Sequence, residues 1–266
     1  MLIPHDLPAF GYKKQLARRF DRASQSYDSY AEFQRIVLER LLSLLPTQPA
    51  DVVVDLGTGT GQALASLSSV FQPTSCVALD LSAQMLSVAR TRSSSLENIQ
   101  FVCADAEQLP FQSSSCDVVF SSLAIQWCLA PEALFEELYR VTKPGGYVIF
   151  STLSQDSMPE IRQAWSALDD KEHVHQYISI AALLECVSAS GWRISSAELS
   201  RVPMWFASAE EAIDSLKKVG ASLITSDSPS TMSPSVWKCF LHEYSKQKTD
   251  LGIPLSYQVA FVVAQK

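Results

Sequence analysis

Five short runs of apolar residues, several of them rich in valine and isoleucine, recur between residues 52 and 152, and amphipathic segments separate most of them. Runs of this length that end in glycine, serine or an acid are typical of buried strands, and apolar residues at helical spacing indicate helices between them. We expect strands at 52–55, 76–80, 99–103, 116–122 and 147–152, with helices at 62–70, 83–92 and 132–141. This alternation, at intervals of about 20–25 residues, favours a doubly wound α/β fold with a parallel sheet.

The rest of the chain is predicted to add mainly helices. Residues 14–45 are expected to be helical, with an apolar stripe that packs on the sheet and consists of Phe33, Val37, Leu41, Leu44 and Leu45. Further helices are expected at 158–169, 179–190, 207–220 and 233–248, and further strands at 192–199 and 257–264. A Ser/Pro-rich stretch at 225–234 is the best candidate for a mobile loop.

The first strand leads into a glycine loop. Asp55 is followed by Gly57, Gly59 and Gly61, in the spacing D-x-G-x-G-x-G. Alternate glycines permit a sharp turn and let the backbone approach a ligand closely, and the next helix presents its free N–H groups to that turn. The spacing differs from the G-x-G-x-x-G of dinucleotide-binding folds. On its own, the loop is equally compatible with a tight turn that binds nothing.

Two further acids follow the second and third strands. Asp80 lies 23 residues after Gly57, and an acid about 20 residues beyond such a loop accepts hydrogen bonds from ribose hydroxyls in nucleotide-binding folds. Alternatively, Asp80 and Ser82 only cap the next helix. Asp105 follows the third strand. These two acids and Asp55 all fall at the carboxyl ends of strands, where such sheets bind their ligands.

Composition is that of a globular protein, with 47% apolar and 18% charged residues. No apolar run approaches the roughly 18 residues that cross a membrane, and the N-terminus lacks a secretory signal, so we expect a cytoplasmic protein without membrane contacts. The net charge of −7 argues against a nucleic-acid partner. The six cysteines form no C-x-x-C pair and are expected to be reduced, buried thiols. His173 and His175 are expected on the surface, and no metal site is expected.

One segment is basic against this acidic background. Lys13, Lys14, Arg18, Arg19 and Arg22 lie within ten residues, with Asp21 as the single acid among them. At helical spacing Lys14, Arg18 and Arg22 share one face. This face is either a solvated helix surface or a docking patch for an acidic partner.

Longer phrases of the sequence resemble known families. The glycine loop resembles motif I of the class I methyltransferases, which bind S-adenosylmethionine (AdoMet). Phrases over nearly the whole chain resemble the malonyl-acyl-carrier-protein O-methyltransferases of biotin synthesis, namely residues 20–28, 123–128, 137–141, 150–153, 158–160, 163–165, 205–206, 215–221 and 255–257. The departures are mild: Thr58 stands where cysteine is common, and Lys218 and Val219 replace small or other apolar residues.

The resemblance implies a Rossmann-like, seven-stranded, mostly parallel sheet whose last strand is antiparallel. It divides the chain into an N-terminal helical segment over the active site (1–45), an AdoMet-binding core (46–155), and the last strands with an inserted helical lid (156–266). It also implies that the cofactor AdoMet is bound by Asp55, Gly57, Thr58, Gly59, Gly61, Asp80, Leu81, Met85, Asp105, Ala106, Leu123 and Gln34.

The implied reaction is methylation of the free carboxylate of malonyl-acyl carrier protein, or of malonyl-CoA, in an early step of biotin synthesis. A methyltransferase for a quinone precursor or another small molecule is one alternative, and a non-catalytic AdoMet-binding module is another. No general base is needed because the carboxylate is ionised at pH 7, so side chains act by positioning.

Two groups of residues are expected to serve the acceptor. Its carboxylate would be positioned by Tyr27, Gln126, Trp127 or Trp205, together with a cation from Arg22, Arg35 or Lys217. The acidic carrier protein would dock on Lys13, Lys14, Arg18, Arg19 and Arg22, with Lys217 and Lys218 as a second basic group.

Overall fold

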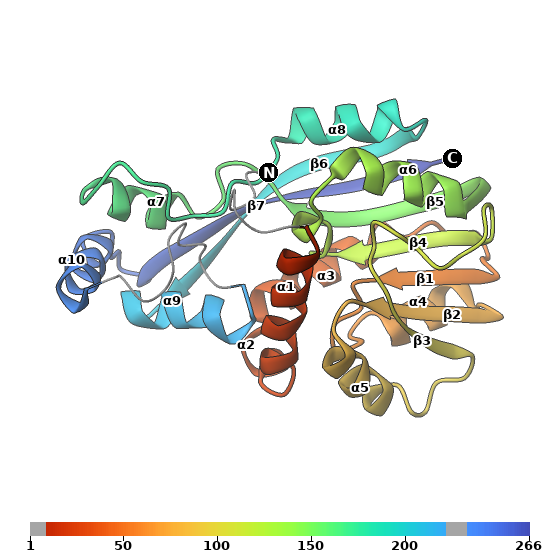
Figure 1. Cartoon of the computed structure of the whole chain (residues 1–266), viewed down its shortest axis with the longest axis horizontal. Coiled ribbons are helices and arrows are strands. Elements are labelled where there is room, and N and C mark those ends of the chain that lie inside the picture. The colour runs from red at the N-terminus through yellow and green to blue at the C-terminus, as the bar shows by residue number, and fades with distance from the viewer. Residues whose placement is uncertain (1–8, 222–232) are drawn as a thin grey trace.

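The computed structural model describes residues 9–221 and 233–266. Its centre is a seven-stranded sheet in the order β3-β2-β1-β4-β5-β7-β6 (Figure 1). Strands β1 to β5 are parallel, and β7 runs antiparallel between β5 and β6, as the sequence predicted. The strands are β1 (Val52–Leu56), β2 (Ser75–Asp80), β3 (Ile99–Cys103), β4 (Cys116–Ser122), β5 (Thr142–Leu153), β6 (Arg193–Phe206) and β7 (Ile253–Gln265).

Helices cover both faces of this sheet because successive strand residues point to opposite sides. In β1, Val53 belongs to the core shared with α3 (Glu32–Leu42) and α4 (Leu64–Phe71). Its neighbour Val54 belongs to the core shared with α6 (Pro131–Val141) and α8 (Ile180–Ala189). Helix α5 (Ala83–Arg92) packs on β2 and β3. From β1 the sheet is extended in one direction by β2 and β3 and in the other by β4 and β5. Sheets of this class open a ligand crevice at the point between β1 and β4 where the strand order switches.

The N-terminal helical segment is broken where one long helix was expected. It forms α1 (Ala9–Ala23), α2 (Tyr27–Tyr30) and α3. Ser24 and Ser26 donate side-chain hydrogen bonds to the carbonyls of Asp21 and Ala23, so they compete with the helical ladder at the first break. The predicted apolar stripe does face the sheet, with Val37 and Leu41 fully buried.

Strand β6 is longer than the predicted 192–199 and extends to Phe206. Its whole length pairs with β7, from Arg193 opposite Gln265 to Phe206 opposite Ile253. The sequence prediction stopped early because β6 is an edge strand, and its mostly exposed residues, including Pro203, do not form an apolar run. The predicted helices after residue 60 are correct to within three residues at each end.

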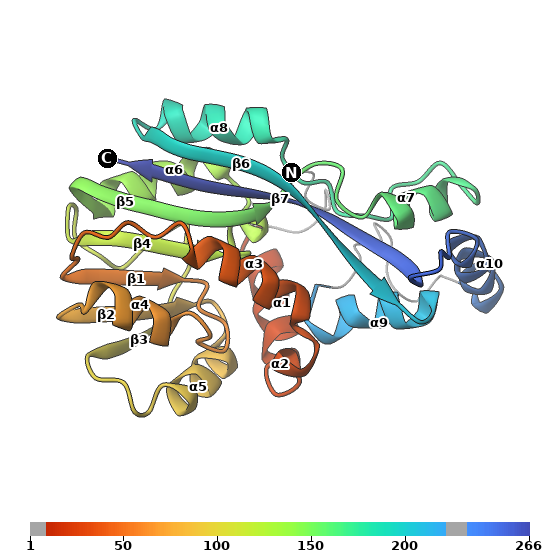
Figure 2. The same cartoon turned by 180° about the vertical axis from the view of Figure 1, so that it is seen from behind.

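Three helices gather at the far end of β6 and β7, on the side where β1, β4 and β5 end (Figures 1 and 2). These are α7 (Pro159–Ser166), α9 (Ala209–Lys218) and α10 (Pro234–Ser245). Helix α9 contacts β6, β7 and α2, and α10 packs on α7. Most of the predicted mobile loop at 225–234 lies outside the described residues. No helix in the described ranges is long and apolar enough to span a bilayer.

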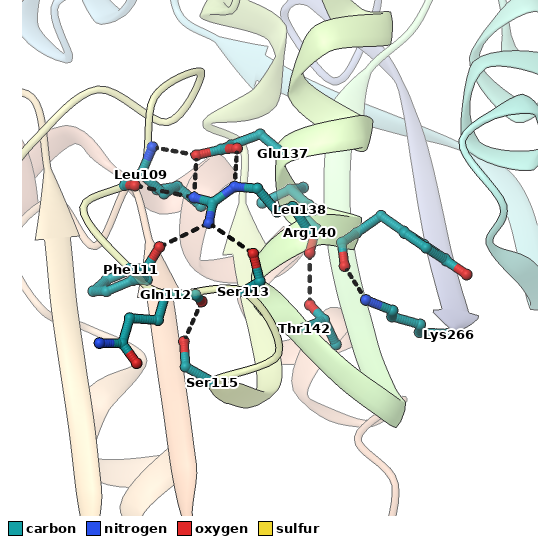
Figure 3. Close-up of polar contacts among 11 residues, drawn as sticks. Leu109, Phe111, Gln112, Ser113, Ser115, Glu137, Leu138, Arg140, Thr142 and Lys266 are labelled. Carbon is teal, nitrogen blue, oxygen red and sulfur yellow. Dashed lines mark hydrogen bonds and ion pairs between the residues drawn. The ribbon is translucent and has the colours of Figure 1, made fainter.

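An arginine fork fixes the connection between β3 and β4 (Figure 3). The Arg140 guanidinium makes two 2.7 Å bonds to the Glu137 carboxylate and donates to the carbonyls of Phe111 and Leu109. Glu137 in turn accepts the Leu109 N–H at 2.8 Å. The family-like phrase at 137–141 therefore has a structural role, since it holds the loop that follows Asp105 against α6.

Two expectations about side-chain burial are wrong. His175 is buried, with 8% of its surface exposed, and it packs near Trp127 and Tyr177. Burial lowers the pKa of His175 to about 4. Of the six cysteines, all free, only Cys76 and Cys116 are buried, whereas Cys103 and Cys239 are exposed. In each case the local sequence did not reveal which elements pack over the residue.

Candidate active site

The glycine loop after β1 uses its glycines for different purposes. All three have positive φ, at +71° for Gly57, +55° for Gly59 and +78° for Gly61. A Cβ on Gly57 would lie 2.2 Å from the Cβ of Ala124, and one on Gly61 would lie 3.0 Å from side chains of Ala89 and Leu64. A Cβ on Gly59 would meet nothing within 4 Å. Gly57 and Gly61 are therefore required by packing, while Gly59 faces open space where a ligand can approach the backbone.

The Asp80 carboxylate joins the ends of β1 and β2. One of its oxygens accepts the Gly59 N–H at 2.9 Å, and the other accepts the Ser82 N–H at 2.8 Å. Ser82 itself caps α5 by accepting the Met85 N–H. Burial raises the pKa of Asp80 to about 6, although these backbone donors favour its charged form. Ser82 is thus the helix cap, and Asp80 bridges two loops and faces the cavity between them.

Asp55 is buried at the end of β1, with 2% of its surface exposed. Its carboxylate accepts the Thr58 hydroxyl at 2.6 Å. Desolvation raises its pKa to about 7, and the nearby Asp80 adds to this rise. Thr58, which departs from the family pattern, therefore supplies a hydrogen bond to the loop.

Asp105, after β3, is held within a small cluster of charges. It accepts the Glu107 N–H at 3.0 Å and forms an ion pair with Lys13 of α1, and Lys13 also pairs with Glu107. The other Glu107 oxygen accepts the N–H groups of Leu129 and Ala130 just before α6. Lys13, expected in an exposed docking patch, instead lines the cavity.

A first cavity opens beside the glycine loop, between Asp80 and Asp105. It runs over the ends of β1, β2, β3 and β4. Its lining includes eight residues that the sequence assigned to cofactor binding, namely Gly57, Gly59, Asp80, Leu81, Met85, Asp105, Ala106 and Leu123. Asp55, Thr58 and Gln34 line a smaller cavity on the other side of the glycine loop. Gly61 lines neither.

Another cavity, called the second cavity below, lies beside the first on the side of α7 and α9. Phe20, Tyr27, Leu123 and Trp127 line both cavities and so form the boundary between them. Phe20 of α1 packs edge-on against Trp127 of η1 (Ile125–Trp127), with ring centroids 5.8 Å apart. Beyond this boundary the second cavity contains about 510 Å³ of open space and is lined by Gln34, Gln126, Leu153, Met158, Tyr177, Leu216, Tyr257 and several other residues.

The structure separates the predicted acceptor residues into two groups. Tyr27, Gln126 and Trp127 line the second cavity, whereas Trp205 is 40% exposed on β6 and lines none of these cavities. Arg22 and Arg35 are exposed on α1 and α3, and Lys217 is exposed on α9, where it pairs with Asp214. Neither Arg22, Arg35 nor Lys217 lines a cavity described above.

Sequence reasoning missed several residues that build the site. Tyr177 and Tyr257 line the second cavity from positions 80 residues apart in the chain. Asp28 accepts the Thr60 hydroxyl at 2.7 Å and the Gln62 amide at 2.8 Å, and it pairs with Arg92. Asp28 stands within the family-like phrase at 20–28, which was the available signal for it. No periodicity pointed to Tyr177.

The buried Asp55 makes the stability of the folded protein depend on pH. The folded state retains the Asp55 proton up to about pH 7, whereas the unfolded chain releases it near pH 3.8, so Asp55 lowers the free energy of unfolding as pH rises between these values. Without ligand, we expect the free energy of unfolding of Asp55→Asn, relative to that of the parent, to rise by about 2–3 kcal/mol from about pH 5 to about pH 8. Urea unfolding of both proteins over this range measures the difference. A stability difference that is the same at both ends would contradict a raised Asp55 pKa.

Comparison with known proteins agrees with this geometry. A family model described as a methyltransferase domain matches residues 54–150. A malonyl-[acyl-carrier protein] O-methyltransferase of Marinomonas sp. (strain MWYL1) is 66% identical over 266 residues, which cover 100% of this chain and 98% of that protein. The biotin biosynthesis bifunctional protein BioHC of Cellvibrio japonicus is 34% identical over 96% of this chain and 50% of its own length.

Among solved structures, the YcgJ protein of Bacillus subtilis matches with a TM-score of 0.64, over 87% of this chain and 98% of that one. At 19% identity this likeness supports the fold alone. The Marinomonas relative matches far more specifically, and its similarity includes α7, α9 and α10 as well as the sheet. The chain therefore belongs to the family of malonyl-[acyl-carrier protein] O-methyltransferases.

Proposed function

We propose that this protein transfers the methyl group of AdoMet to the free carboxylate of a malonyl group carried on acyl carrier protein, as an early step of biotin synthesis. The observation that carries the proposal is the pair of adjoining cavities. One has the loops and acids of a nucleoside site, the other has no charged side chain in its described lining, and Tyr27 and Trp127 form their common wall. Such an arrangement can hold a donor and an acceptor face to face.

The first cavity fits AdoMet in shape and charge. The open space beside Gly59 admits a ligand against the backbone. Two buried carboxylates, Asp80 in this cavity and Asp55 in the smaller one beside the glycine loop, have raised pKa values because their hydrogen bonds offset only part of the cost of desolvation. A cationic ligand with ribose hydroxyls supplies both positive charge and hydrogen-bond donors. The residues proposed to hold it are Asp55, Gly57, Thr58, Gly59, Gly61, Asp80, Leu81, Met85, Asp105, Ala106, Leu123 and Gln34.

The protein's own part in the reaction is to position the acceptor and exclude water. When bound, AdoMet supplies a methyl group on a sulfonium, whose S–C electrons return to sulfur as the carboxylate oxygen forms the new bond. The malonyl carboxylate is already ionised at pH 7, so no side chain has to remove a proton. Phe20, Leu123 and Trp127 enclose the boundary between the cavities with apolar surface, which keeps water from the reacting groups.

The acidic carrier is proposed to dock on exposed cations of α1. Lys14, Arg18 and Arg22 are exposed at i, i+4 and i+8 of this helix, whereas Lys13 is occupied by Asp105 and Glu107. Lys217 and Lys218, exposed on α9, are a second basic group. Because the whole chain carries a charge of −7, attraction to an acidic partner depends on such local patches. We also propose a cytoplasmic location, where malonyl carriers are made.

Gly59 and Gly57 give a matched pair of tests for the cofactor site. Gly59→Ala should lose at least about tenfold in AdoMet affinity, because its methyl group would occupy the ligand's approach, while a positive φ costs an alanine only about 1–2 kcal/mol of stability. Gly57→Ala should be destabilised by more than this, because its new Cβ would meet Ala124 at 2.2 Å. Calorimetric titration with AdoMet and urea unfolding separate the two effects. Unchanged AdoMet affinity in a folded Gly59→Ala would remove the proposed site.

Labelled AdoMet distinguishes the possible activities and tests the docking surface. We expect methyl transfer to malonyl-acyl carrier protein and, more slowly, to a short malonyl thioester that lacks the carrier. Reversing charge with Arg18→Glu and Arg22→Glu should raise KM for the carrier-bound substrate by several-fold at low salt, with a smaller effect at high salt and none on the short thioester. Lys248→Glu, an exposed change after α10, is the matched control.

Other outcomes of this assay would overturn the proposal. Transfer to a quinone precursor in preference to any malonyl thioester would indicate a different small-molecule methyltransferase. AdoMet binding with no transfer to either acceptor would indicate a non-catalytic binding module. Equal effects of Lys248→Glu and the α1 substitutions would contradict a specific docking patch.

A further inference from the structure

The second cavity is rich in polar groups, yet none of those that line it within the described residues carries a charge. Its polar side chains are Tyr27, Gln34, Gln126, Trp127, Tyr177 and Tyr257, and the remaining lining residues are apolar. The cavity that adjoins the cofactor site would thus receive an anionic acceptor without a cation in its lining. This contrasts with the first cavity, which contains Lys13, Asp80, Asp105 and Glu107.

Two of these tyrosines are held in fixed positions by different parts of the fold. The Tyr257 ring stacks on Phe33, with centroids 3.9 Å apart, and Tyr257 pairs with Val202 in the sheet. The Tyr177 ring packs edge-on against His175 at 5.1 Å. The carbonyl of the next residue, Ile178, accepts both the Gln155 N–H and the Ser154 hydroxyl at 3.1 Å. Both rings are therefore oriented before any acceptor enters.

The hydroxyls of Tyr177 and Tyr257 have no hydrogen-bond partner among residues 9–221 and 233–266. Neither hydroxyl oxygen is fully enclosed by protein atoms. Tyr244 differs, because its hydroxyl donates to the Pro254 carbonyl at 2.8 Å. Burial raises the pKa of both Tyr177 and Tyr257 above the usual tyrosine value. Both hydroxyls thus remain protonated at neutral pH and are available as donors.

We propose that the hydroxyls of Tyr177 and Tyr257 hold the malonyl carboxylate by hydrogen bonds and are the specificity determinants of the acceptor cavity. This inference rests on the proposed function, and it replaces a cationic anchor with neutral donors. The polar lining is completed by Tyr27, Gln34, Gln126 and Trp127. Of the Gln126 side chain, the amide nitrogen already donates to the Leu123 carbonyl at 2.7 Å and the oxygen accepts the Thr152 hydroxyl.

Neutral donors suit the chemistry of this nucleophile. The carboxylate loses its negative charge as the ester forms, so a full ion pair would stabilise the substrate more than the transition state and raise the barrier. Hydrogen bonds from hydroxyls orient the oxygens with a smaller ground-state penalty. They also discriminate between substrate and product, because an ester accepts weaker hydrogen bonds than a carboxylate does.

Tyr177→Phe and Tyr257→Phe test this proposal because each removes only a hydroxyl. With the short malonyl thioester that lacks the carrier, each substitution should lower kcat/KM by about 10- to 100-fold, the scale of a lost hydrogen bond to a charged group. AdoMet affinity should be unchanged. A more specific measure is the preference for the acid over its methyl ester. It is given by the ratio of the inhibition constant of the ester product to the KM of the malonyl substrate. The parent should prefer the acid, and the double variant should lose that preference.

Controls make each outcome decisive. Tyr244→Phe removes a buried tyrosine hydroxyl outside the cavity, so it should lower thermal stability without changing the acid-over-ester preference. Variants of Tyr177 and Tyr257 that fold and keep the parent's kcat/KM and preference would overturn the proposal. So would loss of the preference in Arg22→Gln or Lys217→Gln alone, which would establish a cationic anchor. If the parent itself methylates no malonyl thioester, the proposed function fails rather than this inference.

Discussion

The bridge that Asp80 makes between two backbone N–H groups is the constraint on which the site depends. Its carboxylate fixes the glycine loop through Gly59 and the start of α5 through Ser82. Burying a carboxylate is costly, and hydrogen bonds from two N–H groups offset only part of that cost, so the pKa remains raised to about 6. The same carboxylate faces the first cavity. Structural support and the proposed contact with the ligand therefore share one side chain.

The N-terminal helices depend on the same edge of the sheet. Lys13 contacts the loop after β3, Asp21 accepts the Ser82 hydroxyl at 2.6 Å after β2, and Asp28 contacts Thr60 and Gln62 after β1. Each of these polar contacts reaches a different strand end, so α1 and α2 are tied across the cofactor cavity at several points. The family-like phrase at 20–28 thus has a physical explanation, because its acids reach the loops that the glycines and Asp80 form.

The sequence revealed those parts of the site whose signal is local. Asp55, the glycines, Asp80 and Asp105 each follow a strand, and strand ends converge on one edge of a parallel sheet. In the second cavity, Tyr27, Gln126 and Trp127 were expected from the family-like phrases, whereas Tyr177 and Tyr257 were not assigned to the site. Tyr177 comes from an irregular segment and Tyr257 from an antiparallel strand, and only the order β5-β7-β6 brings them together. Lys13 was misplaced for a related reason, since helical spacing shows which residues share a face but not that an acid cluster lies opposite one of them.

Charge is distributed in a way that suits the two cavities to different ligands. Asp80 at the end of β2 and Asp105 after β3 favour a cation in the first cavity, while the second presents hydroxyl and amide groups without a charged side chain in its described lining. A methyl transfer from a sulfonium to a carboxylate cancels both charges at the moment the bond forms. An enzyme that neutralised either partner strongly beforehand would stabilise the reactants over the transition state. The cations of α1 lie outside both cavities, apart from Lys13, whose charge is already paired. The proposed docking of an acidic carrier and the proposed orientation of its carboxylate therefore use separate surfaces, so that one can be strong without impeding the other.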